Sequence, residues 1–182
     1  GYVYDPEGVV TQEKIDYLLE MRANTNGKIK DYADRFGVEF IPGKKPWERK
    51  VDIIMPCATQ NELNGDEAKA LIANGVIAVA EGANMPSTPE AIEAFDAARV
   101  LFSPGKASNA GGVATSGLEM SQNASRSYWK REKVDAMLKE MMAGIYQQMK
   151  DNAGDDGTLE EGCNRAGFLK VAHALKELGW VY

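Results

Sequence analysis

The chain has 182 residues, which is enough for one full domain with a real core and too few for two comfortable ones. Its net charge of -6 argues against nucleic acid as a main partner, because phosphate binding needs clustered Lys and Arg. No apolar run is long enough to cross a bilayer, and the two cysteines give no disulfide framework, so we expect no membrane partner and a reducing cytoplasm.

The first quarter of the chain predicts two helices and a short strand. Residues 11–24 (TQEKIDYLLEMRAN) have the pattern of an amphipathic helix with Thr11 as its N-cap. A second short helix is expected over 28–36, where Gly37 would end it. A short strand is expected over 38–41, before a loop rich in proline and lysine.

The middle of the chain alternates apolar runs with helical patterns. Strands are expected over 51–56 (VDIIMP), 76–82 (VIAVAEG) and 99–104 (RVLFSP), with helices over 62–73 and 88–98 between them. Continuous apolar runs are typical of strands buried on both faces. This rhythm predicts a parallel sheet with crossover helices. Three further helices are expected over 112–128, 131–150 and 158–178.

Each predicted strand is followed by a loop with an unusual cluster of small and polar residues. The three loops read PCATQNEL, EGANMPSTPE and SPGKASNAGGVATSG. Ligands of open parallel sheets bind outside the carboxyl ends of the strands, so these loops predict a binding site at one edge. Taken singly, each loop also has a structural reading: a helix cap by Thr59 or Asn61, a tight turn at Gly82 and Asn84, or close helix-on-sheet packing over 109–117.

Several specific catalytic motifs are excluded, because residues that they require are replaced in this sequence. A phosphate loop is excluded because Val100 stands where its first glycine is needed and Ala107 follows the lysine. A nucleophile elbow around Ser116 fails because Ala114 replaces its first glycine. His173, the single histidine, lies in a helical pattern, and it lacks the spacing to the cysteines that a zinc site requires. We therefore expect neither a hydrolytic triad nor a metal site.

The third loop makes local chemical sense as a ligand site. If its helix starts near Gly111 or Gly112, the amides and the positive end of the helix dipole face the cleft. Val113 and Ser116 are three residues apart and share a helix face. An apolar contact beside a hydroxyl suits a small ligand with a methylene chain that ends in a carboxylate.

Taken together, three segments resemble glutamate dehydrogenase. They are VDIIMPCATQNEL, AVAEGANMPSTPEA and LFSPGKASNAGGVATSGLEMSQNA, in that order. The similarity runs the length of the chain and includes the PGKKPW loop. EGANMP with SGLEM looks most like the small-subunit hexameric bacterial type, which is usually NADP-dependent. Related leucine and phenylalanine dehydrogenases share NAGG but not PCATQNEL or EGANMP.

The resemblance implies an α/β fold: a Rossmann-like parallel sheet with crossover helices, lacking its first strands and followed by C-terminal helices. Residues 1–182 would be a partial dinucleotide-binding domain with closing helices, the C-terminal piece of a larger enzyme. In the family a Gly-rich turn holds the pyrophosphate, and an N-terminal domain carries the catalytic lysine and aspartate. Neither is found in this sequence. We therefore assign no catalytic residue here and expect the chain alone to be inactive.

The resemblance also implies binding roles for nine residues. Those expected along the nicotinamide and its ribose are Ala58, Thr59, Gln60, Asn84 and Asn109. Those expected against glutamate are Gly111, Gly112, Val113 and, on its side-chain carboxylate, Ser116.

The implied reaction is hydride transfer between the α-carbon of glutamate and the nicotinamide. An imine forms and water opens it to 2-oxoglutarate and ammonia. The expected cofactor is NADP, with NAD as the alternative, and the expected assembly is a homo-hexamer in the cytoplasm. A rival interpretation stays open: a non-catalytic Rossmann-like module that binds a small ligand.

Overall fold

The computed structural model describes residues 1–24, 27–155 and 157–179, in two compact units. The first unit is Gly1–Glu48 and the second is Arg49–Tyr182. Within the described ranges, no helix combines the length and the apolar character that crossing a membrane requires.

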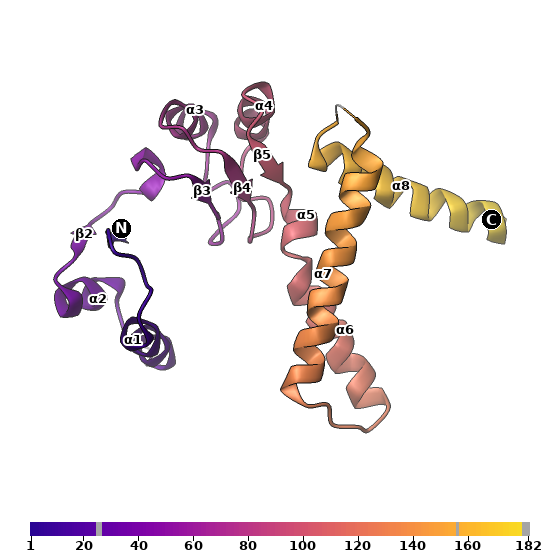
Figure 1. Cartoon of the computed structure of the whole chain (residues 1–182), viewed down its shortest axis with the longest axis horizontal. Helices are drawn as coiled ribbons and strands as arrows, with labels where there is room; N and C mark the ends of the chain where they lie inside the picture. Colours follow the sequence, from indigo (N-terminus) through magenta and orange to yellow (C-terminus); the bar gives the residue numbers. More distant parts are fainter. Residues whose placement is uncertain (25–26, 156, 180–182) are drawn as a thin grey trace. The chain divides into compact units, whose positions relative to one another are not determined.

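The first unit is a strand pair with two helices (Figure 1). Its elements are β1 (Tyr2–Tyr4), α1 (Gln12–Ala23), α2 (Ile29–Phe36), β2 (Glu39–Ile41) and the short 3-10 helix η1 (Pro46–Glu48). β1 and β2 are antiparallel, with Val3 opposite Phe40. The two helices and the strand predicted here are confirmed to within one residue at each end. β1 escaped prediction because three residues are too few to show an alternating pattern.

Local capping sets the helix bounds in this unit. The Thr11 side chain accepts a hydrogen bond from the backbone N–H of Lys14, as expected of an N-cap. Gly37 ends α2 in the left-handed conformation, at φ 66°, which glycine adopts without steric cost.

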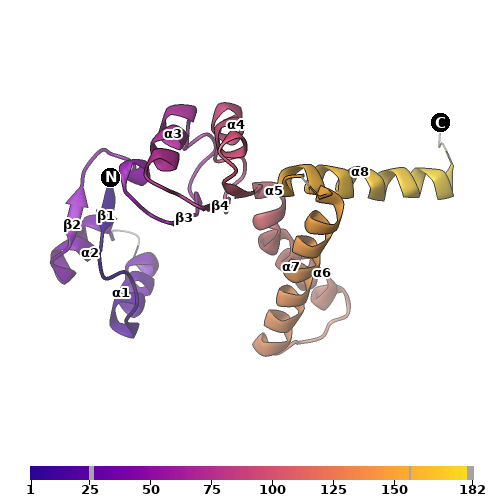
Figure 2. The ribbon, with the colours of Figure 1, turned by 45° about the horizontal axis from the view of Figure 1, so that its top comes forward.

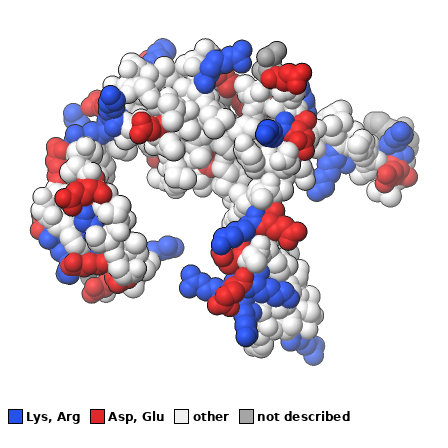
Figure 3. Space-filling model, in the orientation of Figure 1, with Lys and Arg blue, Asp and Glu red and all other residues white. Residues whose placement is uncertain are grey.

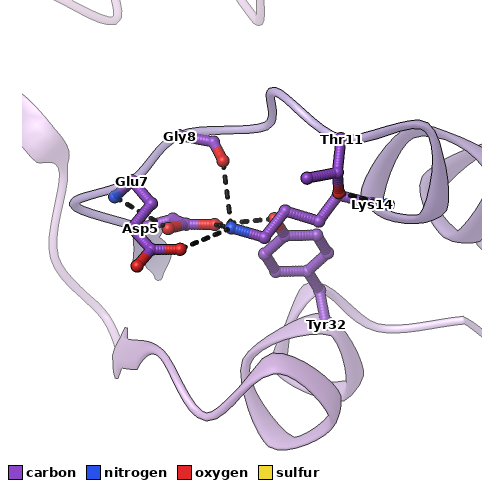
Figure 4. Close-up of polar contacts among 6 residues, drawn as sticks. All are labelled: Asp5, Glu7, Gly8, Thr11, Lys14 and Tyr32. Carbon is purple, nitrogen blue, oxygen red and sulfur yellow. Dashed lines mark hydrogen bonds and ion pairs between the residues drawn. The ribbon is translucent and has the colours of Figure 1, made fainter.

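A buried polar cluster holds the first unit together (Figure 4). Lys14 Nζ lies 2.7 Å from Asp5 Oδ2 and donates to Gly8 O at 3.0 Å. The Tyr32 hydroxyl donates to the same Asp5 oxygen at 2.8 Å. Burial, assisted by that carboxylate, raises the pKa of Tyr32 to about 12, whereas the hydrogen bond from Lys14 lowers the pKa of Asp5. Both charges are paired, so this cluster is structural.

The second unit contains the predicted parallel sheet. Its strands and crossover helices are β3 (Ile53–Ile54), α3 (Gly65–Ala73), β4 (Ala78–Ala80), α4 (Pro89–Ala97) and β5 (Leu101–Ser103). The strands are parallel in the order β3-β4-β5, and Ile54, Val79 and Phe102 lie side by side in register. The Rossmann-like α/β class with crossover helices is confirmed.

Helices α3 and α4 lie side by side on one face of this sheet (Figure 2). On the covered face, Ile54, Val79 and Phe102 are at most 5% exposed. On the other face, Ile53 and Leu101 are 58% and 57% exposed. The prediction of strands buried on both faces is therefore wrong for the described residues, because α3 and α4 cover only one of them.

The strands and α3 are shorter than predicted, for local reasons. Pro56 and Pro104 have no N–H and cannot extend the ladder of β3 or β5. The side chain of Asn64 accepts hydrogen bonds from Asp66 N and Glu67 N, so α3 begins at Gly65 rather than near residue 62.

Four helices close the second unit. They are α5 (Gly105–Ser108), α6 (Ala110–Ala124), α7 (Arg131–Ala153) and α8 (Leu159–Leu178). Three are the predicted ones, but α6 starts two residues earlier and ends four earlier than expected, since Arg126 turns the chain at a positive φ of 51°. The short helix α5 was not predicted, because its small residues carry no helical periodicity.

Candidate functional site

Three loops meet at the carboxyl edge of the parallel sheet. They follow β3, β4 and β5 and span 56–64, 81–88 and 104–109. Backbone hydrogen bonds tie the first loop to the second: Gly82 N and Ala83 N donate to Pro56 O at 2.9 and 3.2 Å, and Leu63 N donates to Pro86 O at 3.0 Å. The predicted convergence of the loops is confirmed, because parallel strands present their carboxyl ends at one edge.

A cleft of about 520 Å³ opens between these loops and the start of α6. Its lining residues are Cys57, Ala58, Gln60, Gly82, Ala83, Asn84, Asn109, Gly112 and Val113. Six of the nine residues predicted to bind ligand are in this set: Ala58, Gln60, Asn84, Asn109, Gly112 and Val113. The volume is within the range of small-molecule sites.

Two asparagines from different loops form the polar centre of the cleft. Asn109 Nδ2 donates to Ala83 O at 3.2 Å and to Asn84 Oδ1. The Nδ2 group of Asn84 makes no hydrogen bond to the described residues. Asn84 is exposed, and its amide therefore has donors available to a ligand.

Glycine permits the loops to approach each other closely at two points. A Cβ at Gly82 would overlap with Cys57 Sγ, and a Cβ at Gly105 would lie 2.6 Å from Ala83 O. Glycine at these two positions allows close backbone packing within the site, and Gly82 also lines the cleft.

Within α6, two neighbouring glycines have different surroundings. A Cβ at Gly111 would meet Leu138 Cδ1 at 3.6 Å and Met142 Sδ at 3.7 Å, so this residue faces α7. Nothing lies within 4 Å of a Cβ built on Gly112, which lines the cleft. The space beside Gly112 is open for a ligand.

Three predicted residues lie outside the lining: Thr59, Gly111 and Ser116. Thr59 and Ser116 are exposed. The Ser116 hydroxyl makes no hydrogen bond to the described residues, whereas Thr115 and Ser121 on the same helix donate to backbone carbonyls four residues earlier. Their ligand roles stay predictions.

Sequence reasoning missed one buried side chain beside the cleft. Glu81 is 3% exposed, and its carboxylate accepts hydrogen bonds from two backbone amides, of Ser87 and Gly105. The signal for it was present: a carboxylate that directly follows an apolar strand must be paired if it is buried.

The lining, as far as the described residues form it, holds no Lys, Arg, His, Asp or Glu. The nearby Lys106 donates to Asn164 Oδ1 at 2.6 Å and lies 3.8 Å from Glu160, so it contacts α8. Elsewhere in the second unit, basic and acidic side chains are interspersed over α7, on the face that Figure 3 shows. Among the described residues, no three His, Cys, Asp or Glu side chains are grouped to hold a metal ion.

The cleft can therefore bind and orient a ligand by amide donors, backbone and apolar contact. The described residues of its lining supply no carboxylate, lysine or imidazole for proton transfer.

Comparison with known proteins gives a consistent set of relatives. The family model described as glutamate/leucine/phenylalanine/valine dehydrogenase matches residues 1–179. The NAD-specific glutamate dehydrogenase of Bacteroides fragilis is 54% identical over 183 residues, covering 98% of this chain and 41% of its own length. The NADP-specific enzyme of Escherichia coli is 54% identical over 181 residues, covering 98% and 40%.

A solved structure of a glutamate dehydrogenase mutant superimposes with a TM-score of 0.93 at 48% identity, covering 100% of this chain and 41% of that one. The chain thus spans about two fifths of the length of the relatives that it matches.

Proposed function

This chain belongs to the glutamate/leucine/phenylalanine/valine dehydrogenase family, and on that premise we propose that it forms the cofactor-binding part of a glutamate dehydrogenase. The reaction is the reversible oxidative deamination of L-glutamate to 2-oxoglutarate and ammonia. The observation that carries this proposal is the cleft at the carboxyl edge of the sheet, which Asn84, Asn109, Gly112 and Val113 line together.

The residues of the cleft fit a nicotinamide cofactor. The ring is flat and carries a carboxamide, so it needs amide partners and a surface without bulky side chains. Asn84 has unused amide donors, and the position of a Cβ on Gly112 is open. When bound, the cofactor accepts the hydride of the substrate; the protein supplies its position and its surroundings.

The same helix would receive the amino acid. Val113 is 74% exposed and lines the cleft, so its methyl groups can contact the methylene chain of glutamate. Ser116, one turn further along α6, has a hydroxyl that is not used by the described residues and can donate to a carboxylate. Thr59 and Gly111 also remain proposed ligand contacts, although neither residue lines the cleft.

We expect proton transfer to use groups outside this cleft, because the described residues of its lining include no Lys, His, Asp or Glu. The proposed role of the chain is to bind and orient the reactants. Holding the reacting atoms in place can lower the activation barrier substantially. By itself the chain is expected to give no turnover.

We propose NADP as the cofactor, with NAD as the alternative. Both kinds of specificity occur at the same identity among the relatives, so family membership alone does not choose between them. We also propose, from the resemblance, a homo-hexamer in the cytoplasm whose partners are the small-molecule substrates, with neither nucleic acid nor membrane among them.

The test is steady-state kinetics of the enzyme that carries this chain, with glutamate and either cofactor. Asn84→Ala should raise the cofactor KM roughly fivefold to tenfold, the loss expected for one or two neutral hydrogen bonds, and change kcat little. Asn123→Ala is the matched control: the same change on an exposed residue of α6 away from the cleft.

Equal effects of the two variants would reject the cleft as the cofactor site. Cofactor binding by the whole enzyme without any reduction of the cofactor by glutamate would instead support a non-catalytic binding module.

A further inference from the structure

One buried carboxylate joins two of the three loops. Glu81 Oε1 accepts from Ser87 N at 3.2 Å, and Oε2 accepts from Gly105 N at 2.7 Å. Glu81 is only 3% exposed. Both oxygens of this carboxyl group act as acceptors of backbone N–H groups.

These two amides lie at structurally important points. Ser87 closes the loop that contains Asn84, and Gly105 begins the short helix α5 that leads to Asn109. Asn109 N donates to Gly105 O at 2.9 Å, so moving Gly105 moves Asn109. The Ser87 hydroxyl is buried without a hydrogen-bond partner among the described residues. Ser87 contacts the Glu81 carboxylate through its backbone N–H instead.

The packing leaves little freedom for this arrangement. A Cβ at Gly105 would lie 3.2 Å from Glu81 Oε2 and 2.6 Å from Ala83 O. The carboxylate therefore sets the spacing between the β4 loop and α5. Across that spacing Asn109 Nδ2 reaches Ala83 O and Asn84 Oδ1.

We propose that Glu81 is a positioning residue of the cofactor site: its carboxylate holds the β4 loop against α5 and thereby fixes the Asn84–Asn109 pair at the cleft. The expected effect on cofactor binding rests on the proposed function. The hydrogen bonds themselves do not rest on that function.

The first experiment compares Glu81→Gln with Glu93→Gln. Glutamine keeps the shape but turns one acceptor oxygen into an NH₂ donor, so one of the two backbone N–H groups faces a donor. Glu93 is an exposed residue of α4, and its change should be silent. Glu81→Gln should speed hydrogen exchange at the amides of Ser87 and Gly105 at least about tenfold and raise the cofactor KM by a similar factor, with kcat changed less than about threefold.

A double-mutant cycle separates positioning from general stability. If Glu81 acts through the asparagine pair, Glu81→Gln should add little to the KM increase once Asn109→Ala is present. Additive effects, or a KM unchanged in Glu81→Gln, would overturn the proposal. Glu81→Asp is the second variant, because it keeps the carboxylate but is one methylene shorter. A cofactor KM above that of the unmodified enzyme in Glu81→Asp would assign the effect to the bridging geometry.

Should Glu81→Gln not fold, the same measurements on Glu81→Asp decide, with Glu93→Asp as control. The proposal and the function fail differently. If the unmodified enzyme does not bind NADP or NAD, the proposed function is rejected. In that case hydrogen exchange decides the positioning role without the cofactor. Faster exchange at Ser87 and Gly105 in Glu81→Gln, together with a shift of the Asn109 side-chain amide signals, would support the role. Unchanged exchange and unchanged signals would overturn it.

Discussion

Polar side chains of this protein fall into two kinds of surroundings. In the first unit, Asp5 accepts hydrogen bonds from Lys14 and from Tyr32, and all three side chains are largely buried. The Asn84 Nδ2 group at the cleft and the Ser116 hydroxyl further along α6 make no hydrogen bond to the described residues. Side chains with unused hydrogen-bonding groups beside a cleft are better ligand candidates than buried clusters whose groups are satisfied.

Ser116 gives the residue-scale prediction. In the enzyme that carries this chain, Ser116→Ala should weaken glutamate binding about tenfold to hundredfold and leave cofactor affinity nearly unchanged, because a hydrogen bond to a carboxylate is worth roughly 1.5–3 kcal/mol. Steady-state kinetics with each substrate varied in turn measures both. Ser121→Ala is the matched control, since its hydroxyl already bonds to Gly117 O. An unchanged glutamate KM and kcat/KM in Ser116→Ala would remove Ser116 from the site.

Among the elements, α6 shows that neighbouring small residues can have different purposes. Gly111 allows α7 to come near, whereas Gly112 faces open space in the cleft. The sequence NAGGVATSG cannot separate the two, since which side of the helix meets α7 depends on residues about thirty positions further along the chain. The same holds for Gly105, whose lack of a side chain is needed by the backbone of the β4 loop.

Gly112→Ala is predicted to improve stability while harming binding. Alanine in place of a helical glycine stabilises by about 0.5–1 kcal/mol, and no protein atom opposes the added methyl group. The methyl group would occupy cleft volume, so the KM for glutamate or the cofactor should rise. Gly117→Ala is the control, because its Cβ position is equally open but lies outside the lining. Thermal unfolding and kinetics of both variants test this; similar kinetics would mean that Gly112 has no ligand beside it.

For the molecule as a whole, the uncovered sheet face is the main departure from expectation. Apolar runs of the kind seen in 51–56 and 99–104 predict cover on both faces, and the described helices α3 and α4 supply it on one. Ile53 and Leu101 are left exposed, and among the described strands β3 has a neighbour on one edge only. Exposed apolar surface beside an open strand edge favours association with another chain.

The 182-residue chain by itself is therefore expected to self-associate. Replacing both Ile53 and Leu101 with Lys should shift it toward monomer, because charges on the bare face oppose edge-to-edge and face-to-face contact. Sedimentation velocity measures the change. Leu19→Lys is the control, as Leu19 is 58% exposed, like Ile53, but lies on α1. A chain that is monomeric without substitution would contradict the prediction.

The amino-acid sequence alone predicted most of the helices and the edge of the sheet at which the candidate cleft lies. Thr11, Gly37, Thr88 and Thr158 mark helix ends through hydrogen bonds and dihedral preferences within a few residues. The alternation of apolar runs with helices then implied a parallel sheet, and parallel strands bring their following loops to one edge. Six of the nine ligand residues that the family resemblance implies line the cleft at this edge.

Tertiary structure alone decided which small or polar residue contacts which neighbour. Glu81 meets Gly105 across 24 positions of the chain, and Gly111 faces Leu138 while Gly112 does not. These contacts depend on the packing of loops and helices that are distant in sequence, and no short pattern encodes them. The burial of a strand face depends likewise on which helices cross it. Local hydrogen bonds could be predicted from the sequence because their partners are adjacent in the chain, whereas the shape of the cleft depends on partners that only folding brings together.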